Sequence, residues 1–200
     1  MDTSYVKNYL DSLESARESL IKKGRDILNL CRSIISGVVL GKNVEEDLYK
    51  VSKLFNEVYE QIKSYPELVY SNIFYSIAAE YVEAIQLYSI VTQTRFLSIE
   101  ELNVHPIPYL LGLADTIGEL KRCSLESVRK NKFDEAFKLL ELAEELYNRL
   151  SIFSYPDALL PGFRRKLDVY RRVIDDWKKF LIDMVSRKNL IDGLKVCYRD

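Results

Sequence analysis

The sequence has few of the residues that interrupt a helix: among 200 residues there are seven glycines and five prolines. Glycine and proline destabilise a helix interior most, so their scarcity favours long helices over short strands joined by tight turns. We find no alternating strand pattern of convincing length, no internal repeat and no low-complexity segment. The sequence therefore predicts an all-α protein.

Cysteine and histidine are also scarce. Cys31, Cys123 and Cys197 lie far apart and form no Cys-x-x-Cys or Cys/His spacing, so neither a disulfide framework nor a zinc site is indicated. A reducing cytoplasm is the simplest location for such a chain. No run approaches the ~18 consecutive apolar residues of a membrane span, and the polar N-terminal residues contain no apolar signal core. We therefore expect a soluble cytoplasmic protein with no membrane partner.

Neither sign of charge is in excess. Lys and Arg number 29 against 30 Asp and Glu, a formal net charge of −1. This balance excludes a globally basic nucleic-acid binder, although it leaves room for a local basic patch or channel. Apolar residues make up 48% of the chain, which is enough for a sizeable core. We expect residues 1–200 to form one domain.

Apolar residues recur every three or four positions along most of the chain and predict a bundle of about six helices. The expected ranges are 2–39, 44–64, 66–93, 109–130, 133–152 and 163–187. The first helix exceeds the ~20 residues of most globular helices, which suggests that part of it packs on another element or subunit. Asn43 and Glu46 fit a capping box before the second helix. Residues 94–108 should connect two helices through one short turn, and a frayed tail should follow residue 187.

Two acidic pairs stand out because they lie in otherwise apolar helical segments. Glu80 and Glu83 occur in AAEYVEAI, and Asp115 and Glu119 occur in YLLGLADTIGEL. A spacing of three or four residues places both members of a pair on one helix face. A carboxylate on so apolar a face is costly unless something compensates its charge, and a divalent cation would do so. The alternative is that each pair lies on a solvated face.

The ligand type narrows the choice of metal. Antiparallel packing of neighbouring helices would bring the four carboxylates together, where they must take up protons or bind a cation. The single histidine, His105, lies in the proline-rich connection, so the site would be all-oxygen, which favours Mg²⁺ or Mn²⁺. Gly112 and Gly118 are costly in a helix interior and suggest that a helix, a metal shell or a substrate approaches the backbone there.

The same residues carry a family likeness. The segments EYVEA (80–84), QTRFLSIEELN (93–103) and YLLGLADTIGELKR (109–122) resemble the translin family, and within it the translin-associated factor X (TRAX) branch. The basic segment KKGRDILNLCR and the closing helix FRRKLDVYRRVIDD also fit that pattern. The chain lacks the basic N-terminal extension and the long insert of eukaryotic TRAX, which is typical of prokaryotic, archaeal relatives.

The resemblance implies a fold of about seven helices and a hollow, roughly octameric shell. It also implies that the chain is a metal-dependent endoribonuclease acting on single-stranded RNA. The catalytic carboxylates of the family fall on Glu80, Glu83, Asp115 and Glu119, where Mg²⁺ or Mn²⁺ would polarise the scissile phosphate and activate a water. Whether the chain forms a homo-oligomer or needs a separate translin-like partner subunit stays open.

RNA phosphates need positive charge beside the acidic site. The candidate RNA-binding residues are Lys22, Lys23, Arg25, Arg32, Arg95 and Arg122. The basic run RRKLDVYRR is a further candidate, but a solvated helix face or a subunit contact explains it equally well.

Two other functions remain possible on sequence grounds. The first is a non-catalytic scaffold that binds single-stranded RNA or DNA, and the second is a helical adaptor that binds only protein. The complete set of four carboxylates is the feature that favours the ribonuclease over both.

Overall fold

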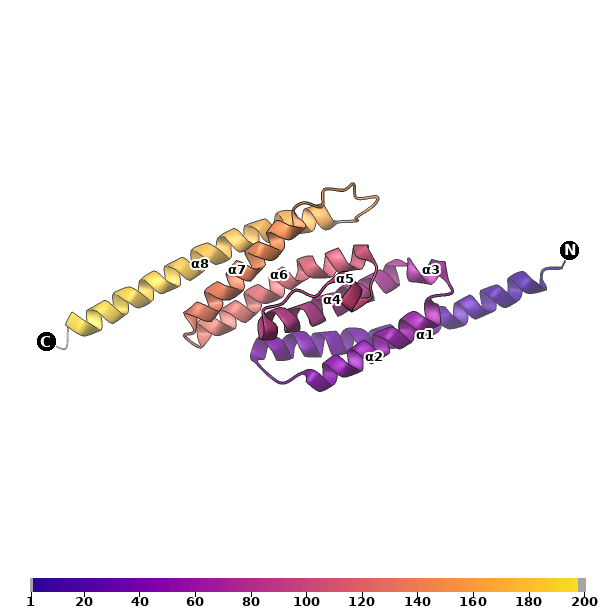
Figure 1. Ribbon diagram of the computed structural model, residues 1–200, viewed down its shortest axis with the longest axis horizontal. Helices are drawn as coiled ribbons and strands as arrows, with labels where there is room; N and C mark the ends of the chain where they lie inside the picture. Colours follow the sequence, from indigo (N-terminus) through magenta and orange to yellow (C-terminus); the bar gives the residue numbers. More distant parts are fainter. Residues whose placement is uncertain (1, 198–200) are drawn as a thin grey trace. The chain divides into compact units, whose positions relative to one another are not determined.

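The computed structural model describes residues 2–197, with side chains as far as Lys195, and contains helices and turns but no β-strand in that range. The all-α prediction is confirmed. The helices are α1 (Ser4–Leu40), α2 (Glu45–Ile62), α3 (Pro66–Val69), α4 (Asn72–Gln93), α5 (Ile99–Leu102), α6 (Pro106–Arg129), α7 (Phe133–Leu150) and α8 (Phe163–Cys197) (Figure 1). The helices α3 and α5 have only four residues each, so six long helices remain, as predicted.

The helices belong to two compact units, one up to Leu113 and the other from Ala114. The boundary falls inside α6, whose first two turns belong to the first unit. The prediction of a single domain over residues 1–200 stays a prediction. No helix in residues 2–197 is long and apolar enough to cross a membrane.

The first unit is built on α1, which packs against α2 and α4. Residues on one face of α1 are buried at helical spacing, including Leu20, Ile27, Cys31 and Ile34. Gly24 lies on this face, where a Cβ atom would come within 2.4 Å of the side chain of Ile77. The glycine therefore lets α1 and α4 approach closely. The N-terminal turns of α1 extend past the other helices of this unit, as the prediction of a long first helix implied (Figure 1).

The predicted third helix, residues 66–93, is wrong in one respect: it is broken into α3 and α4. Tyr70 ends α3, and Ser71 begins α4 in an extended conformation with its Oγ accepting a hydrogen bond from the Phe74 amide. A serine at this position satisfies an amide that a continuous helix would have paired with a carbonyl. The apolar pattern continues across Tyr70 and Ser71, so the break between α3 and α4 is determined by the local capping interaction alone.

The predicted capping box at Asn43 and Glu46 is also wrong. The α2 N-cap is Val44, and the Asn43 side chain accepts from the Glu45 amide instead. A complete capping box occurs at Ser98 and Glu101, where it starts the short helix α5 within the predicted connection. The helix α6 begins at Pro106 rather than Tyr109, because the first helical turn needs no amide donors and tolerates proline.

The second unit contains α7 and α8 packed side by side together with the remainder of α6 (Figure 1). The α6 residue Ser124 donates a hydrogen bond to the Ala136 carbonyl of α7 and accepts one from Trp177 Nε1 of α8, each 3.0 Å long. The helix α8 continues to Cys197, so the tail predicted after residue 187 is wrong as far as Cys197, and residues 198–200 lie outside the described range. An ion pair one helical turn apart, Lys195 with Asp192, supports these extra turns.

Candidate functional site

The first acidic pair lies on α4, the most enclosed helix of the first unit. Glu83 is 8% exposed, and Glu80 is half-buried. The neighbours of Glu83 along the helix, Val82 and Ala84, are fully buried. Burial of an ionised carboxylate is costly unless a donor or a cation compensates its charge. The alternative of a solvated face is excluded for Glu83 by its burial.

Both carboxylates act on Cys31 of α1. The pKa of the Cys31 thiol is raised to about 12, first because the thiol is buried and then because the negative charges of Glu80 and Glu83 oppose a thiolate. The acidic pair therefore lies close to the buried face of α1. Cys31 itself stays a neutral, buried thiol and has no reactive role.

Gly112 brings the start of α6 onto α4 next to the acidic pair. A Cβ atom at Gly112 would lie 2.4 Å from the Ala79 carbonyl oxygen and 2.7 Å from Val82 Cβ. The sequence indicated a close approach to the backbone at Gly112, and within the first unit the approaching element is α4. Ala79 immediately precedes Glu80, so the tight contact is adjacent in sequence to a candidate ligand.

The second acidic pair lies on α6 within the second unit. Lys166 Nζ donates to both carboxylate oxygens of Asp115, at 2.7 Å and 2.5 Å, and the Tyr170 hydroxyl donates to Oδ1 at 3.1 Å. Lys166 and Tyr170 are one turn apart on α8, so both face the same side of that helix. Gly118 on α6 leaves room for the Tyr170 ring, since a Cβ there would lie 3.3 Å from Tyr170 Cε1.

Glu119 is paired within its own helix. Arg122 donates to its Oε2 at 2.6 Å, and the side chain of Glu119 is 18% exposed against 54% for Arg122. Burial raises the pKa of the neighbouring Cys123 thiol to about 12, with a smaller contribution from the Glu119 charge. Cys123, like Cys31, is a buried neutral thiol.

The two acidic pairs lie in different units, and the contacts given above for each pair are contacts within its own unit. Among residues 2–197, it contains no group of three or more His, Cys, Asp or Glu side chains arranged to hold a metal ion. The convergence of all four carboxylates on one cation therefore stays a prediction. His105 takes no part in either pair as described, because its Nδ1 hydrogen-bonds the Tyr75 hydroxyl at 2.9 Å and its ring stacks on that of Tyr75.

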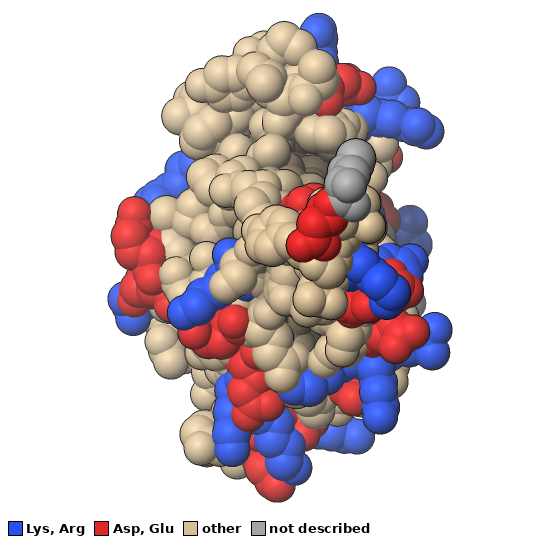
Figure 2. Space-filling view, turned by 90° about the vertical axis from the view of Figure 1, so that its right-hand side faces the viewer, with Lys and Arg blue, Asp and Glu red and all other residues tan. Residues whose placement is uncertain are grey.

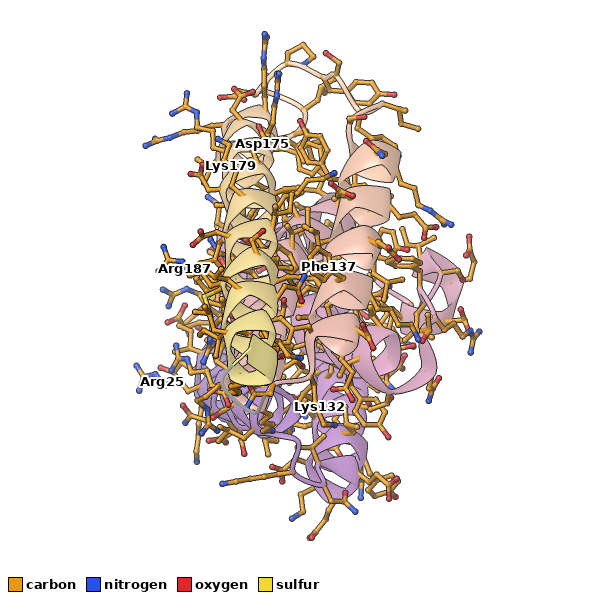
Figure 3. The ribbon with its side chains drawn as sticks, turned by 90° about the vertical axis from the view of Figure 1, so that its left-hand side faces the viewer. Arg25, Lys132, Phe137, Asp175, Lys179 and Arg187 are labelled. Carbon is orange, nitrogen blue, oxygen red and sulfur yellow. The ribbon has the colours of Figure 1, made fainter. Side chains whose placement is uncertain are left out.

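The predicted RNA-binding residues fall into two groups. Lys22, Arg25 and Arg32 are exposed on α1, within about 80° of one another and opposite its buried face, and Arg25 projects away from the helix (Figure 3). Lys23 is 4.0 Å from Glu57. Arg95 and Arg122 instead contact acidic side chains of their own units, Glu101 and Glu119. The α1 residues are thus the better placed of the six to receive a phosphate.

The sequence reasoning missed Lys166 and Tyr170 as partners of Asp115. Both belong to the basic run RRKLDVYRR, for which the sequence indicates an RNA contact, a solvated helix face or a subunit contact. The signal that distinguishes them is their i,i+4 spacing beside the buried Leu167 and Ile174, which marks an inward-facing side of α8. The more exposed members of the run, such as Arg171 and Arg172, lie on other faces.

Comparison with known protein families identifies the family of this chain. Residues 15–185 match the family described as the translin family, and the match includes all four carboxylates, Lys166 and Tyr170. The chain belongs to the translin family. The predicted family is thereby confirmed, whereas the assignment to its TRAX branch stays a prediction.

Translin-family relatives cover nearly the whole chain. The uncharacterized protein MJ0175 of Methanocaldococcus jannaschii is 31% identical over 97% of this chain and 87% of its own length, which supports a prokaryotic member of the family. Among solved structures, AfC3PO in a complex with duplex RNA is 33% identical, with a TM-score of 0.87 over 94% of this chain and 100% of that one. The structure of apo-NeC3PO is 27% identical, with a TM-score of 0.82 over 92% of this chain and 97% of that one.

Proposed function

We propose that this translin-family chain is a Mg²⁺- or Mn²⁺-dependent endoribonuclease that cleaves single-stranded RNA. Its active site would be formed by Glu80, Glu83, Asp115 and Glu119. The observation that carries the proposal is the acidic pair on α4, where Glu83 is 8% exposed and lies between the fully buried Val82 and Ala84. A buried carboxylate does not stabilise the folded state unless a cation or a strong hydrogen-bond donor compensates its negative charge.

The nucleic-acid part of the proposal is supported by a relative. AfC3PO, 33% identical to this chain, has been solved in a complex with duplex RNA. The net charge of −1 means that RNA must be held by a local patch rather than by the whole surface. Figure 2 shows acidic and basic side chains interspersed over one face of the molecule, with no uniformly basic surface there. Lys22, Arg25 and Arg32 on α1 form the candidate patch.

The donors fit a hard divalent cation. All four are carboxylates, the ligand type that Mg²⁺ and Mn²⁺ prefer, and Asp115 already attracts the ammonium of Lys166 to both its oxygens. A bound metal would supply Lewis-acid polarisation of the scissile phosphate and a more acidic water.

The protein's own residues have two tasks in this proposal. The carboxylates on α4 and α6 hold their oxygens in fixed positions, since each helix is anchored by buried residues on both sides of the pair. The exposed α1 cations face away from the α4 pair, so they would bind RNA phosphates at a distance from the cleaved bond. We propose a homo-oligomer as the active form, in which exposed apolar residues of α8 such as Ile182, Leu190 and Ile191 would become buried.

A second candidate function is a non-catalytic scaffold for single-stranded RNA or DNA. The pairing of Asp115 with Lys166 and of Glu119 with Arg122 favours it, because both α6 carboxylates have cationic partners without any metal. The scaffold would bind nucleic acid with a strong dependence on salt and would leave it intact.

Cleavage of labelled RNA separates the two functions. We expect the purified protein to cut a single-stranded RNA in Mn²⁺ or Mg²⁺ and to lose at least about 100-fold in rate on Glu83→Gln or Asp115→Asn, since each removes a ligand charge. The measurement is the rate of appearance of internal cleavage products on a denaturing gel. The same RNA annealed to its complement tests the strand preference, because the relative was solved with duplex RNA.

Glu141→Gln is the matched control, since Glu141 is an exposed α7 carboxylate outside both pairs. It should cleave at the wild-type rate. Binding without cleavage in the wild-type protein, with affinity unchanged in Glu83→Gln, would establish the scaffold instead.

A further inference from the structure

The contact between Lys166 and Asp115 has a feature that distinguishes it from the surface ion pairs. The ammonium bonds both oxygens of one carboxylate, and both side chains are 29% exposed. Many other ion pairs of the chain link residues one turn apart on the same helix, with exposures of about one half or more. Lys166 and Asp115 are 51 residues apart and join α8 to α6 within the second unit.

The surroundings hold Lys166 in this position. Tyr170, one turn further along α8, donates to Oδ1 of the same carboxylate, and its ring fills the space left by Gly118 of α6. The buried Leu167 lies next to Lys166, which fixes this part of α8 in the core. Asp115 therefore receives two donors from α8, of which one is charged and one is neutral.

A charged and a neutral donor differ in how they treat an incoming cation. A carboxylate offers about four lone-pair directions, so the Tyr170 hydroxyl and a metal ion can share it. An ammonium on both oxygens cannot share it as easily, because its positive charge repels a divalent cation at such short range. Lysine has a flexible four-carbon stem and can swing away from the carboxylate without any movement of α8.

We propose that Lys166 is a built-in counter-cation for Asp115, which occupies the carboxylate in the metal-free protein and lowers the affinity of the site for a divalent metal. The inference rests on the proposed function, since it takes Asp115 to be a metal ligand. Lys166 is a positioning residue: it holds the Asp115 carboxylate in its orientation when no metal is bound, and it moves away when a metal binds.

The experiment measures Mn²⁺ binding to the full-length protein without RNA, from the electron paramagnetic resonance signal of free Mn²⁺. Lys166→Met removes the charge and keeps the length of the stem, and we expect it to bind Mn²⁺ at least about fivefold more tightly. Lys166→Arg retains the charge and should stay within about twofold of the wild type. Tyr170→Phe removes only the neutral donor and should not tighten binding.

Lys178→Met is the matched control, because Lys178 lies on the same helix and bonds a different carboxylate, that of Glu144, at 2.9 Å. It removes one positive charge from α8 away from Asp115 and should leave the Mn²⁺ affinity unchanged. Thermal melting gives a second readout, in which added Mn²⁺ should raise the melting temperature of Lys166→Met more than that of the wild type.

The outcomes separate this inference from the proposed function. Unchanged or weaker Mn²⁺ binding in Lys166→Met, with binding that still depends on Glu80 in a Glu80→Gln variant, overturns the inference and leaves the metal site standing. Equal tightening in Lys178→Met also overturns it, since the effect would then be one of general charge. Failure of the wild type and of Lys166→Met to bind Mn²⁺ overturns both.

Discussion

At the scale of single residues, the buried and half-buried carboxylates carry most of the functional information. Glu83 is enclosed in an apolar helix, while Asp115 is bonded by a cation from another helix. A buried carboxylate needs a compensating partner, which Lys166 supplies for Asp115. The proposed function assigns both carboxylates to metal binding.

Gly112 is the residue whose substitution tests the packing beside this pair. In Gly112→Ala, the added methyl would lie 2.4 Å from the Ala79 carbonyl oxygen, which is backbone and cannot rotate away. We expect the free energy of unfolding to fall by about 1–3 kcal/mol because the helices must separate. Urea denaturation followed by circular dichroism measures the change.

Gly193→Ala provides the matched control, since no atom lies within 4 Å of a Cβ built there on α8. It should raise the free energy of unfolding by up to about 1 kcal/mol through helix propensity alone. A Gly112→Ala protein as stable as the wild type would show that α4 and α6 do not pack as described.

The sequence predicted some of these residues and missed others for a physical reason. The acidic pairs and Gly112 can be recognised from the sequence alone, because carboxylates and glycine are unfavourable in the apolar helical segments where they occur. Lys166 is not visible in this way, because a lysine among arginines on a helix is favourable on a solvated face. Only its contact with Asp115, 51 residues away, distinguishes it.

At the scale of elements, one hydrogen-bonded chain links three helices of the second unit. Trp177 Nε1 of α8 donates to Ser124 Oγ of α6, which in turn donates to the Ala136 carbonyl of α7. Trp177 and Ser124 are both fully buried. Because a buried indole N–H without a partner is costly, Ser124 holds α8 in register with α6.

Ser124→Ala leaves the Trp177 N–H without its acceptor, and we expect it to lower the free energy of unfolding by about 1–3 kcal/mol. Thermal or urea unfolding, followed by circular dichroism, measures the loss. Adding Trp177→Phe should make Ser124→Ala less costly than it is alone, because no donor is then left unsatisfied. Equal costs in the two backgrounds would disprove the coupling.

The predicted helix boundaries are correct where the apolar pattern changes at the end of a helix. They are wrong where only local backbone hydrogen bonding determines the boundary. The ranges of α1 and α7 agree with the sequence to within two residues at each end. The break at Ser71 and the start of α6 at Pro106 depend on which amides lack partners, and the apolar pattern carries no such information. The helix α8 continues past its buried face, since no residue from 182 to 195 is buried.

At the scale of the whole molecule, the proposed function draws on both units. Each unit contains one acidic pair, and Mg²⁺ is commonly bound by one or two carboxylates together with waters and substrate phosphates. In the proposed function, the near-neutral charge of the chain leaves RNA binding to the exposed cations of α1. A site that uses all four carboxylates, as proposed, needs both units to be folded.

Anomalous diffraction from a crystal soaked in Mn²⁺ would locate the proposed metal site. We expect a Mn²⁺ peak that shares ligands from Glu80 or Glu83 with ligands from Asp115 or Glu119, and an Asp115 carboxylate that Lys166 no longer bonds through both oxygens. A fully soaked crystal with no Mn²⁺ peak at these four carboxylates, and with Lys166 still on both oxygens of Asp115, would contradict the proposed metal site.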